Sequence, residues 1–379
     1  MKIEKNFPDE MLLMRYYFLD ILEGCNFMSD DRILEFGTAK AKPGEKGTGY
    51  IKVGELSDGS PVNMPVIILN GKNPGTKLLL MALEDGDEYP GSLGGLDACN
   101  NILPDMLKEM NGSVVFLPAV MIDSFRGNPY GGGNRNSSLD IDQGARPSRP
   151  GNPYGKYGAQ LGYKVDQVDK EYDPDAIIKF HGCKQMYGID VIWCWSAPPG
   201  SAHDNFWRAG VIDPDRMLIL GHDAADRARR GLPPLPDRPL SMNLESNGGE
   251  GGIGNGFSGD TMRDSLLNVM RHLKMIPGEE IKSKDIKYVN YIGDLGPEGK
   301  IHSAGINTTR GGFFTSMVDI MDEVKEGQTI GLIKNFFGEV VEEIKSPLDG
   351  FCKSYYCESP HIGSGQWRVF ALAKVIEVR

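Results

Sequence analysis

The segment KLLLMAL, residues 77–83, limits the possible folds of this chain more than any other feature. Apolar residues fill this run almost without interruption, which is typical of a strand that is covered on both faces in the middle of a sheet. Between about residues 50 and 278, further strand-like runs alternate with helix-like stretches. This alternation predicts an α/β fold in which helices cover both faces of a sheet.

Local patterns predict the individual elements of this part. Residues 48–71 alternate short β-rich runs with turn sequences, as a strand meander does. The stretch TMRDSLLNVMRHLKMI, residues 261–276, is an amphipathic helix that Pro277 and Gly278 end. The other expected elements are a helix at 93–110 and strands at 113–120, 175–181 and 238–245.

The two ends of the chain differ from this middle part. Residues 9–28 have apolar positions that fit a helix with one broad apolar face, so we expect an N-terminal helical extension at residues 1–45. That helix could be an interaction or oligomer element, or it could pack on its own domain. After residue 284, short strands alternate with Gly-containing turns, which predicts a small all-β domain at 284–379. Residues 46–283 are then the α/β domain that would carry a catalytic site.

The net charge and the lengths of the apolar runs indicate which partners the chain can bind. The formal net charge is −11 at pH 7, and an acidic protein is not attracted by nucleic acid or by anionic membrane surfaces. No apolar run approaches the roughly 20 residues that span a bilayer, and the start MKIEKNFPDEM lacks the pattern of a signal peptide. The six scattered cysteines are then expected to be reduced thiols. We therefore expect a cytoplasmic protein that acts on a small molecule, has no nucleic acid or membrane partner, and could form a homo-oligomer.

Polar residues follow three of the expected strands. Four carboxylates follow KLLLMAL within five positions, and two of them, Asp85 and Glu88, stand three residues apart. His181 and Glu245 each end a later strand. Chemistry in α/β sheets gathers where strand ends meet loops, so the two carboxylates could point into one cleft, although they could also be solvated turn charges or charges at a helix N-terminus. The histidine could be a packing residue, and the final glutamate is a candidate general base.

The order and spacing of these residues resemble the succinylglutamate desuccinylase/aspartoacylase family, a branch of the zinc carboxypeptidase superfamily. DGDEYPG, residues 85–91, resembles the family's HGDE zinc motif, and KFH, residues 179–181, resembles its DLH motif. NLE, residues 243–245, matches the strand that ends in the family's catalytic acid, and RNSSLDIDQ, residues 135–143, resembles its substrate-binding stretch. The C-terminal part is similar to the family's small β domain, so the resemblance covers about residues 48–379.

The resemblance implies a zinc-carboxypeptidase-like α/β/α sandwich with a mixed sheet, followed by a small barrel-sandwich (lipoyl-like) β domain. It also implies a metal-dependent amidohydrolase of the deacylase type that acts on linear amides. Asp85, Glu88 and His181 would hold one divalent metal, with Asp85 in place of the family's first histidine. A water molecule on that metal would be the nucleophile, Glu245 the general base and acid, and Arg135 the group that polarises the scissile carbonyl. Zinc is the expected metal, and Mn²⁺ or Fe²⁺ become competitors because two carboxylates make the ligand set harder.

One departure from the family pattern leaves an alternative open. Lys179 stands where the family has Asp, and it faces the same side of its strand as His181. An Asp85–Lys179 ion pair could therefore replace the metal, which would make the chain a metal-free, non-catalytic binding or scaffold protein. A thiol hydrolase that uses Cys183 is disfavoured because no spacing pattern supports it.

The substrate stretch departs from the family as well. Asp140, Asp142 and Gln143 are the expected substrate-binding residues, and the last two replace the Asn and Arg with which the family grips a carboxylate. A neutral amide and an acidic side chain predict a substrate whose anchoring group is neutral or cationic. Arg126 and other nearby arginines could restore anion binding, or they could be surface charges.

Overall fold

The structure, a computed structural model, describes most of the chain. The described residues are 32–86, 88–126, 149–182, 186–188, 190–195, 197–222, 235–246, 256–290, 293, 299–356, 361–365 and 368–379. None of the helices in these residues is long and apolar enough to cross a membrane.

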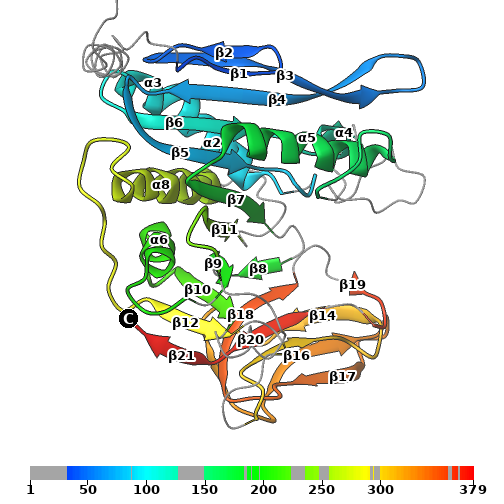
Figure 1. Ribbon diagram of the computed structural model, residues 1–379. Coiled ribbons are helices and arrows are strands. Elements are labelled where there is room, and N and C mark those ends of the chain that lie inside the picture. The colour runs from blue at the N-terminus through cyan, green and yellow to red at the C-terminus, as the bar shows by residue number, and fades with distance from the viewer. Residues whose placement is uncertain are drawn as a thin grey trace, which may run out of the picture.

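Within the described residues, one mixed sheet of ten strands runs through the larger part of the molecule (Figure 1). The strands β6, β5, β7 and β11 are parallel neighbours, whereas β9, β10 and β12 run in the opposite direction to β11. In spatial order, the ten strands are β21 (Val375–Val378), β12 (Lys287–Asn290), β10 (Met217–His222), β9 (Asp190–Trp195), β11 (Leu240–Ser246), β7 (Ala176–Gly182), β5 (Asn73–Met81), β6 (Asn111–Leu117), β4 (Pro61–Asn70) and β3 (Glu45–Glu55).

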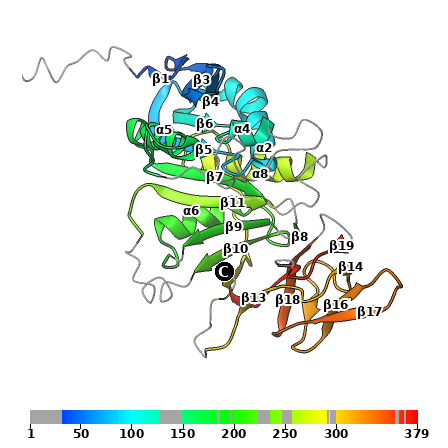
Figure 2. The same ribbon diagram turned by 90° about the vertical axis from the view of Figure 1, so that its right-hand side faces the viewer.

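Helices cover both faces of this sheet (Figure 2). The long helix on one face is α5 (Tyr157–Tyr172), and the opposite face carries α2 (Pro90–Asp97), α6 (Ala202–Gly210) and α8 (Gly256–His272). Shorter helical elements are a π-helical turn (Ala98–Ile102), α3 (Leu103–Met106) and α4 (Ile122–Arg126). The predicted α/β/α sandwich with a mixed sheet is therefore confirmed.

The alternating directions of the β5 side chains explain why the KLLLMAL run is apolar throughout. Leu78 and Leu80 belong to the buried cluster beneath α2 and α8, whereas Leu79 and Met81 belong to the cluster beneath α5. All four side chains are fully buried. A polar residue at any of these positions would lie inside one of the two cores.

Glycines bring α2 very close to the sheet. A methyl group built on Gly91 would lie 2.0 Å from Cβ of Phe180 on β7, and one built on Gly95 would lie 2.5 Å from the ring of Phe116 on β6. Only residues without a side chain allow this approach. The loop that ends at Pro90, the first residue of α2, is thereby held near the end of β7.

Antiparallel strands of the C-terminal region form two further sheets. One sheet contains β13 (Ser303–Ile306), β20 (Phe370–Ala373), β18 (Gly350–Tyr356) and β15 (Glu323–Val324), with β8 (Met186–Gly188) of the α/β part paired to β18. The other contains β17 (Val340–Lys345), β16 (Thr329–Lys334), β14 (Gly312–Ser316) and β19 (His361–Ile362). Side chains of both sheets, including Ile330, Ile333 and Phe370, share one core. The predicted small β domain is confirmed.

Two strands from the C-terminal part of the chain belong to the large sheet. The strands β12 and β21 lie within the predicted all-β region 284–379, yet they belong to the large sheet. A strand as short as β12 has no sequence pattern that distinguishes the two sheets, and its parallel pairing with β10 places it in the large one. Within the predicted helical extension 1–45, residues 1–31 lie outside the described residues, and β1 (Leu34–Phe36) pairs with β2 (Ala39–Ala41) as a hairpin.

The contact between Gly91 and Phe180 gives a first prediction. Gly91→Ala should lower the free energy of unfolding by about 1–3 kcal/mol, because the added methyl overpacks the α2–β7 contact. The measurement is the urea midpoint at an unchanged denaturant slope. The control is Gly363→Ala, since nothing lies within 4 Å of a methyl group built there. A Gly91→Ala midpoint equal to that of the parent would contradict this account of the packing.

Candidate metal centre

Three parallel strands, β5, β7 and β11, are neighbours in the large sheet, so they end at one edge of it. His181 is the next-to-last residue of β7, and Glu245 is the next-to-last residue of β11. The chain leaves β5 after Met81 and reaches Asp85 and Glu88 in the loop before α2. The three polar strand ends therefore gather at one edge, as the α/β pattern predicts.

A strained turn separates β5 from the acidic residues. Leu83 has a φ angle of +52°, which L-residues other than glycine rarely adopt. Backbone hydrogen bonds hold this turn. The N–H of Ala82 donates to the carbonyl of Leu117 (3.0 Å), the N–H of Val120 donates to the carbonyl of Ala82 (3.0 Å), and the N–H of Met121 donates to the carbonyl of Leu83 (2.8 Å). Such a conformation costs on the order of 1–3 kcal/mol and is concentrated at functional sites. Here it changes the direction of the chain immediately before the carboxylates.

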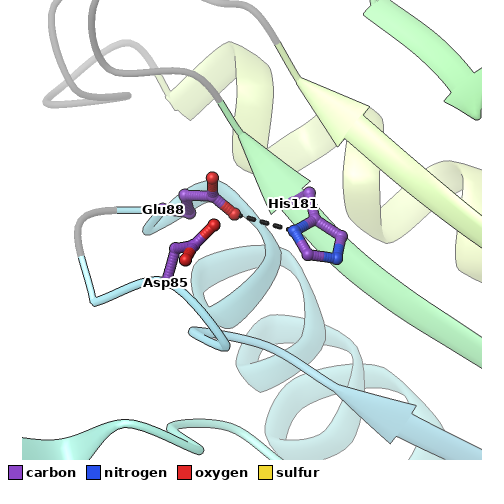
Figure 3. A group of neighbouring side chains, drawn as sticks. All are labelled: Asp85, Glu88 and His181. Atoms are coloured by element: carbon purple, nitrogen blue, oxygen red, sulfur yellow. Dashed lines mark hydrogen bonds and ion pairs between the residues drawn. The ribbon is translucent and has the colours of Figure 1, made fainter. Parts of the chain in front are cut away.

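Asp85, Glu88 and His181 form one tight group. Each offers a ligand atom, and these atoms all lie within 4.8 Å of one another. The Oε2 atom of Glu88 is 3.0 Å from Nδ1 of His181, and Figure 3 shows the carboxylate of Asp85 beside that of Glu88. Both acids are only 2% exposed, and the histidine side chain is 18% exposed. Three potential metal ligands from two strand ends therefore share one largely buried site.

Lys179 has a partner different from the one that the sequence suggested. Its ammonium lies 3.1 Å from each carboxylate oxygen of Glu84. The same Glu84 carboxylate lies 3.5 Å from Nε2 of His181. Among the described residues, Lys179 therefore pairs with Glu84, and not with Asp85 as the metal-free alternative required. The reason is that Glu84, one residue closer to β5, already neutralises the lysine.

The charges of these residues shift two pKa values strongly. Burial alone would lower the pKa of His181, but the hydrogen bonds that its ring donates to Glu84 and Glu88, together with the charges of these carboxylates, raise the pKa to about 10. Burial alone would raise the pKa of Glu84, but His181 and Lys179 lower it to about 2. Both carboxylates therefore favour the protonated form of the imidazole. A metal ion bound at its ring would take the place of that proton.

The donor set fits a divalent transition metal. Two carboxylates and one imidazole are among the ligands that catalytic zinc takes, and three protein ligands leave a fourth position open. Lys179 is paired with Glu84, so Asp85, Glu88 and the imidazole of His181 are the groups that would meet a cation at this site.

Strand pairing relates Glu245 to this group. Glu245 and His181 are direct partners in the parallel ladder between β11 and β7, and Asn243 is the partner of Lys179. Paired residues of neighbouring strands point to the same face of a sheet, so the side chains of Glu245 and His181 share one face. Glu245 is half-buried at this edge. It is therefore placed on the side of the sheet where the candidate metal ligands lie.

Several of the predicted site residues lie outside the described residues. These are Arg135, Asp140, Asp142 and Gln143, together with Cys183 of the thiol alternative. Arg126 is the last residue of α4, which places its backbone in the described part of the chain.

Glu84 is the residue of this site that our sequence reasoning missed. It was one of four carboxylates after KLLLMAL, but we assigned it no role. A signal for it exists at Lys179, which lies two residues before His181 and on the same face of the strand. A half-buried lysine needs a carboxylate partner, and the neighbouring strand end is the place to find one.

Comparisons with known proteins bear on the fold. No protein-family model and no curated protein matches this chain. A solved succinylglutamate desuccinylase from Silicibacter sp. TM1040 is 18% identical, with a TM-score of 0.68 over 92% of this chain and 100% of that chain. The succinylglutamate desuccinylase/aspartoacylase from Rhodobacter sphaeroides is 19% identical, with a TM-score of 0.67 over 88% of this chain and 96% of that chain. The product-bound ectoine utilization protein EutE (DoeB) from Ruegeria pomeroyi is 17% identical, with a TM-score of 0.65 over 87% of this chain and 95% of that chain.

These structures match nearly their whole lengths to this chain. At such identities the likeness concerns the fold, including both the α/β sandwich and the C-terminal β sheets. The resemblance that the sequence motifs predicted is thereby confirmed at the level of architecture: this chain has the fold of the solved succinylglutamate desuccinylase/aspartoacylase structures.

Proposed function

We propose that this chain is a metal-dependent hydrolase that cleaves an amide bond of a small substrate, as a deacylase of the succinylglutamate desuccinylase/aspartoacylase family. The observation that carries the proposal is the group formed by Asp85, Glu88 and His181, whose ligand atoms lie within 4.8 Å of one another. The shared fold with desuccinylase and aspartoacylase structures supports the same activity class.

The three residues would hold one divalent cation, with zinc as the expected ion and Mn²⁺ or Fe²⁺ as competitors. When bound, such a cation polarises a carbonyl oxygen and lowers the pKa of water. His181 would contribute its Nδ1 atom, since this ring nitrogen faces Glu88. The low exposure of Asp85 and Glu88 would keep competing water away from the ligand atoms.

Glu245 would move the proton. A carboxylate at the end of β11, on the same face as His181, can accept a proton from the attacking water and then deliver it to the leaving amine. This role requires a half-buried side chain that keeps contact with solvent, and Glu245 meets this requirement.

Substrate recognition is assigned from the sequence. Arg135 would polarise the scissile carbonyl, and Asp140, Asp142 and Gln143 would line the substrate site. Asp142 and Gln143 favour a substrate whose anchoring group is neutral or cationic, unless Arg126 supplies positive charge. A cytoplasmic location and self-association are further expectations that rest on the sequence alone.

The metal-free alternative loses its structural basis. It required Lys179 to neutralise Asp85, and Lys179 is instead paired with Glu84. Asp85 and Glu88 are instead buried beside His181, as the ligands of one metal would be.

Metal analysis tests the proposal directly. Protein purified without chelator should carry close to one zinc, manganese or iron ion per chain, because the three ligands form a single site. His181→Ala should lose the metal and the hydrolysis of N-acyl amides together. The control is His272→Ala, which removes a histidine paired with Glu280 outside the site and should leave the metal content unchanged. A parent protein that holds none of these metals, and gains no hydrolysis when they are added, would refute the proposal.

Glu245→Gln separates proton transfer from metal binding. Glutamine keeps the shape of the side chain but cannot accept a proton at neutral pH, so the turnover rate should fall about 10²–10⁴-fold. Metal content and thermal midpoint should stay at the parental values. The exposed Glu279→Gln serves as the control and should keep the parental rate. A Glu245→Gln protein with near-parental turnover would assign the base to another residue.

A further inference from the structure

Each ring nitrogen of His181 faces a different carboxylate. Nδ1 lies 3.0 Å from Oε2 of Glu88, and Nε2 lies 3.5 Å from Oε2 of Glu84. The two nitrogens are on different edges of the imidazole ring, so the carboxylates approach the ring from different sides. The side chains of Glu84 and His181 are 13% and 18% exposed, which limits competition from water.

Lys179 fixes the position of the Glu84 carboxylate. The ammonium of Lys179 lies 3.1 Å from both of its carboxylate oxygens. Lys179 and His181 are two residues apart on β7 and share one face, while Glu84 arrives from the loop after β5. A lysine on one strand therefore fixes the carboxylate that meets the histidine of the same strand.

This arrangement gives Glu84 a role different from that of Asp85 and Glu88. Figure 3 shows Asp85 and Glu88 on the side of the ring that carries Nδ1, the nitrogen 3.0 Å from Glu88. Glu84 lies at the other nitrogen, with both of its oxygens engaged by Lys179. Metal-binding histidines commonly donate their second N–H to a carboxylate, which fixes the tautomer and the orientation of the ring.

We propose that Glu84 is a positioning residue for the metal centre. Its carboxylate, held by Lys179, accepts a hydrogen bond from the Nε2–H of His181. This bond fixes the ring so that the lone pair of Nδ1 is directed at the metal. This inference rests on the proposed function, because it requires a metal at Asp85, Glu88 and His181. It also gives a reason for the lysine at position 179, where the family pattern has an acid. The carboxylate comes from the neighbouring strand end, and the lysine holds it there.

The test is a zinc titration of chelator-stripped protein by calorimetry, comparing the parent with Glu84→Gln. Losing the carboxylate should weaken zinc binding about 10- to 100-fold, as the loss of such partners typically does. The thermal midpoint of the metal-free variant should stay close to that of the control. That control is Glu280→Gln, which removes a carboxylate 3.1 Å from His272, in a pair of similar exposure outside the site. It should bind zinc as tightly as the parent.

A purely structural ion pair would behave differently. If Glu84→Gln binds zinc as tightly as the parent, the positioning role is overturned. The role is also overturned if the loss in zinc-binding free energy is no larger than the loss in the free energy of unfolding of the metal-free variant. A parent that binds no zinc, manganese or iron would overturn the proposed function, and this inference with it. A parent that binds metal while Glu84→Gln binds it equally well would overturn the inference alone.

A second readout needs no variant of Glu84. In ¹⁵N-histidine-labelled, zinc-loaded parent protein, the His181 signals are assigned by their loss in His181→Gln, and the remaining histidines serve as internal references. The inference expects Nδ1 of His181 to show the chemical shift of a metal-bound nitrogen, with a slowly exchanging proton on Nε2. Zinc on Nε2, or a rapidly exchanging Nε2 proton, would overturn it.

Discussion

The parallel pairing of β7 with β5 on one side and with β11 on the other is the constraint on which the candidate site depends. These ladders join Lys179 to Met81 and His181 to Glu245. Because the three strands run in one direction, the residues that end or follow them emerge at the same edge of the sheet. A shift of one residue in either ladder would turn the polar side chains of a strand to its opposite face and would separate the group.

Burial raises the free energy of the charged side chains at this edge of the sheet. Carboxylates with almost no exposure, such as Asp85 and Glu88, cost much free energy unless positive charge lies close to them. Lys179 compensates Glu84, and in the absence of a metal a proton on His181 supplies further positive charge. A divalent cation bound at His181 would replace that proton. Metal binding and the stability of this edge are therefore expected to be linked.

The sequence predicted the elements whose patterns are local. The apolar run 77–83 predicted a central covered strand, and the polar residues at the strand ends predicted which side chains would meet. The place of β12 was not predictable, because a four-residue strand such as KYVN fits either a small antiparallel sheet or the large mixed one. The partner of Lys179 was not predictable either, because Glu84 and Asp85 are adjacent acids and only the backbone turn at Leu83 decides which of them meets the lysine.

The central claim is that a divalent cation sits among Asp85, Glu88 and His181. Anomalous X-ray diffraction, measured on crystals of protein supplied with zinc and on both sides of the zinc absorption edge, tests it most directly. The account predicts a single strong anomalous peak within bonding distance of the two carboxylates and of Nδ1 of His181. Crystals in which this position has no peak, while Lys179 or another protein group fills the space between the three side chains, would contradict it.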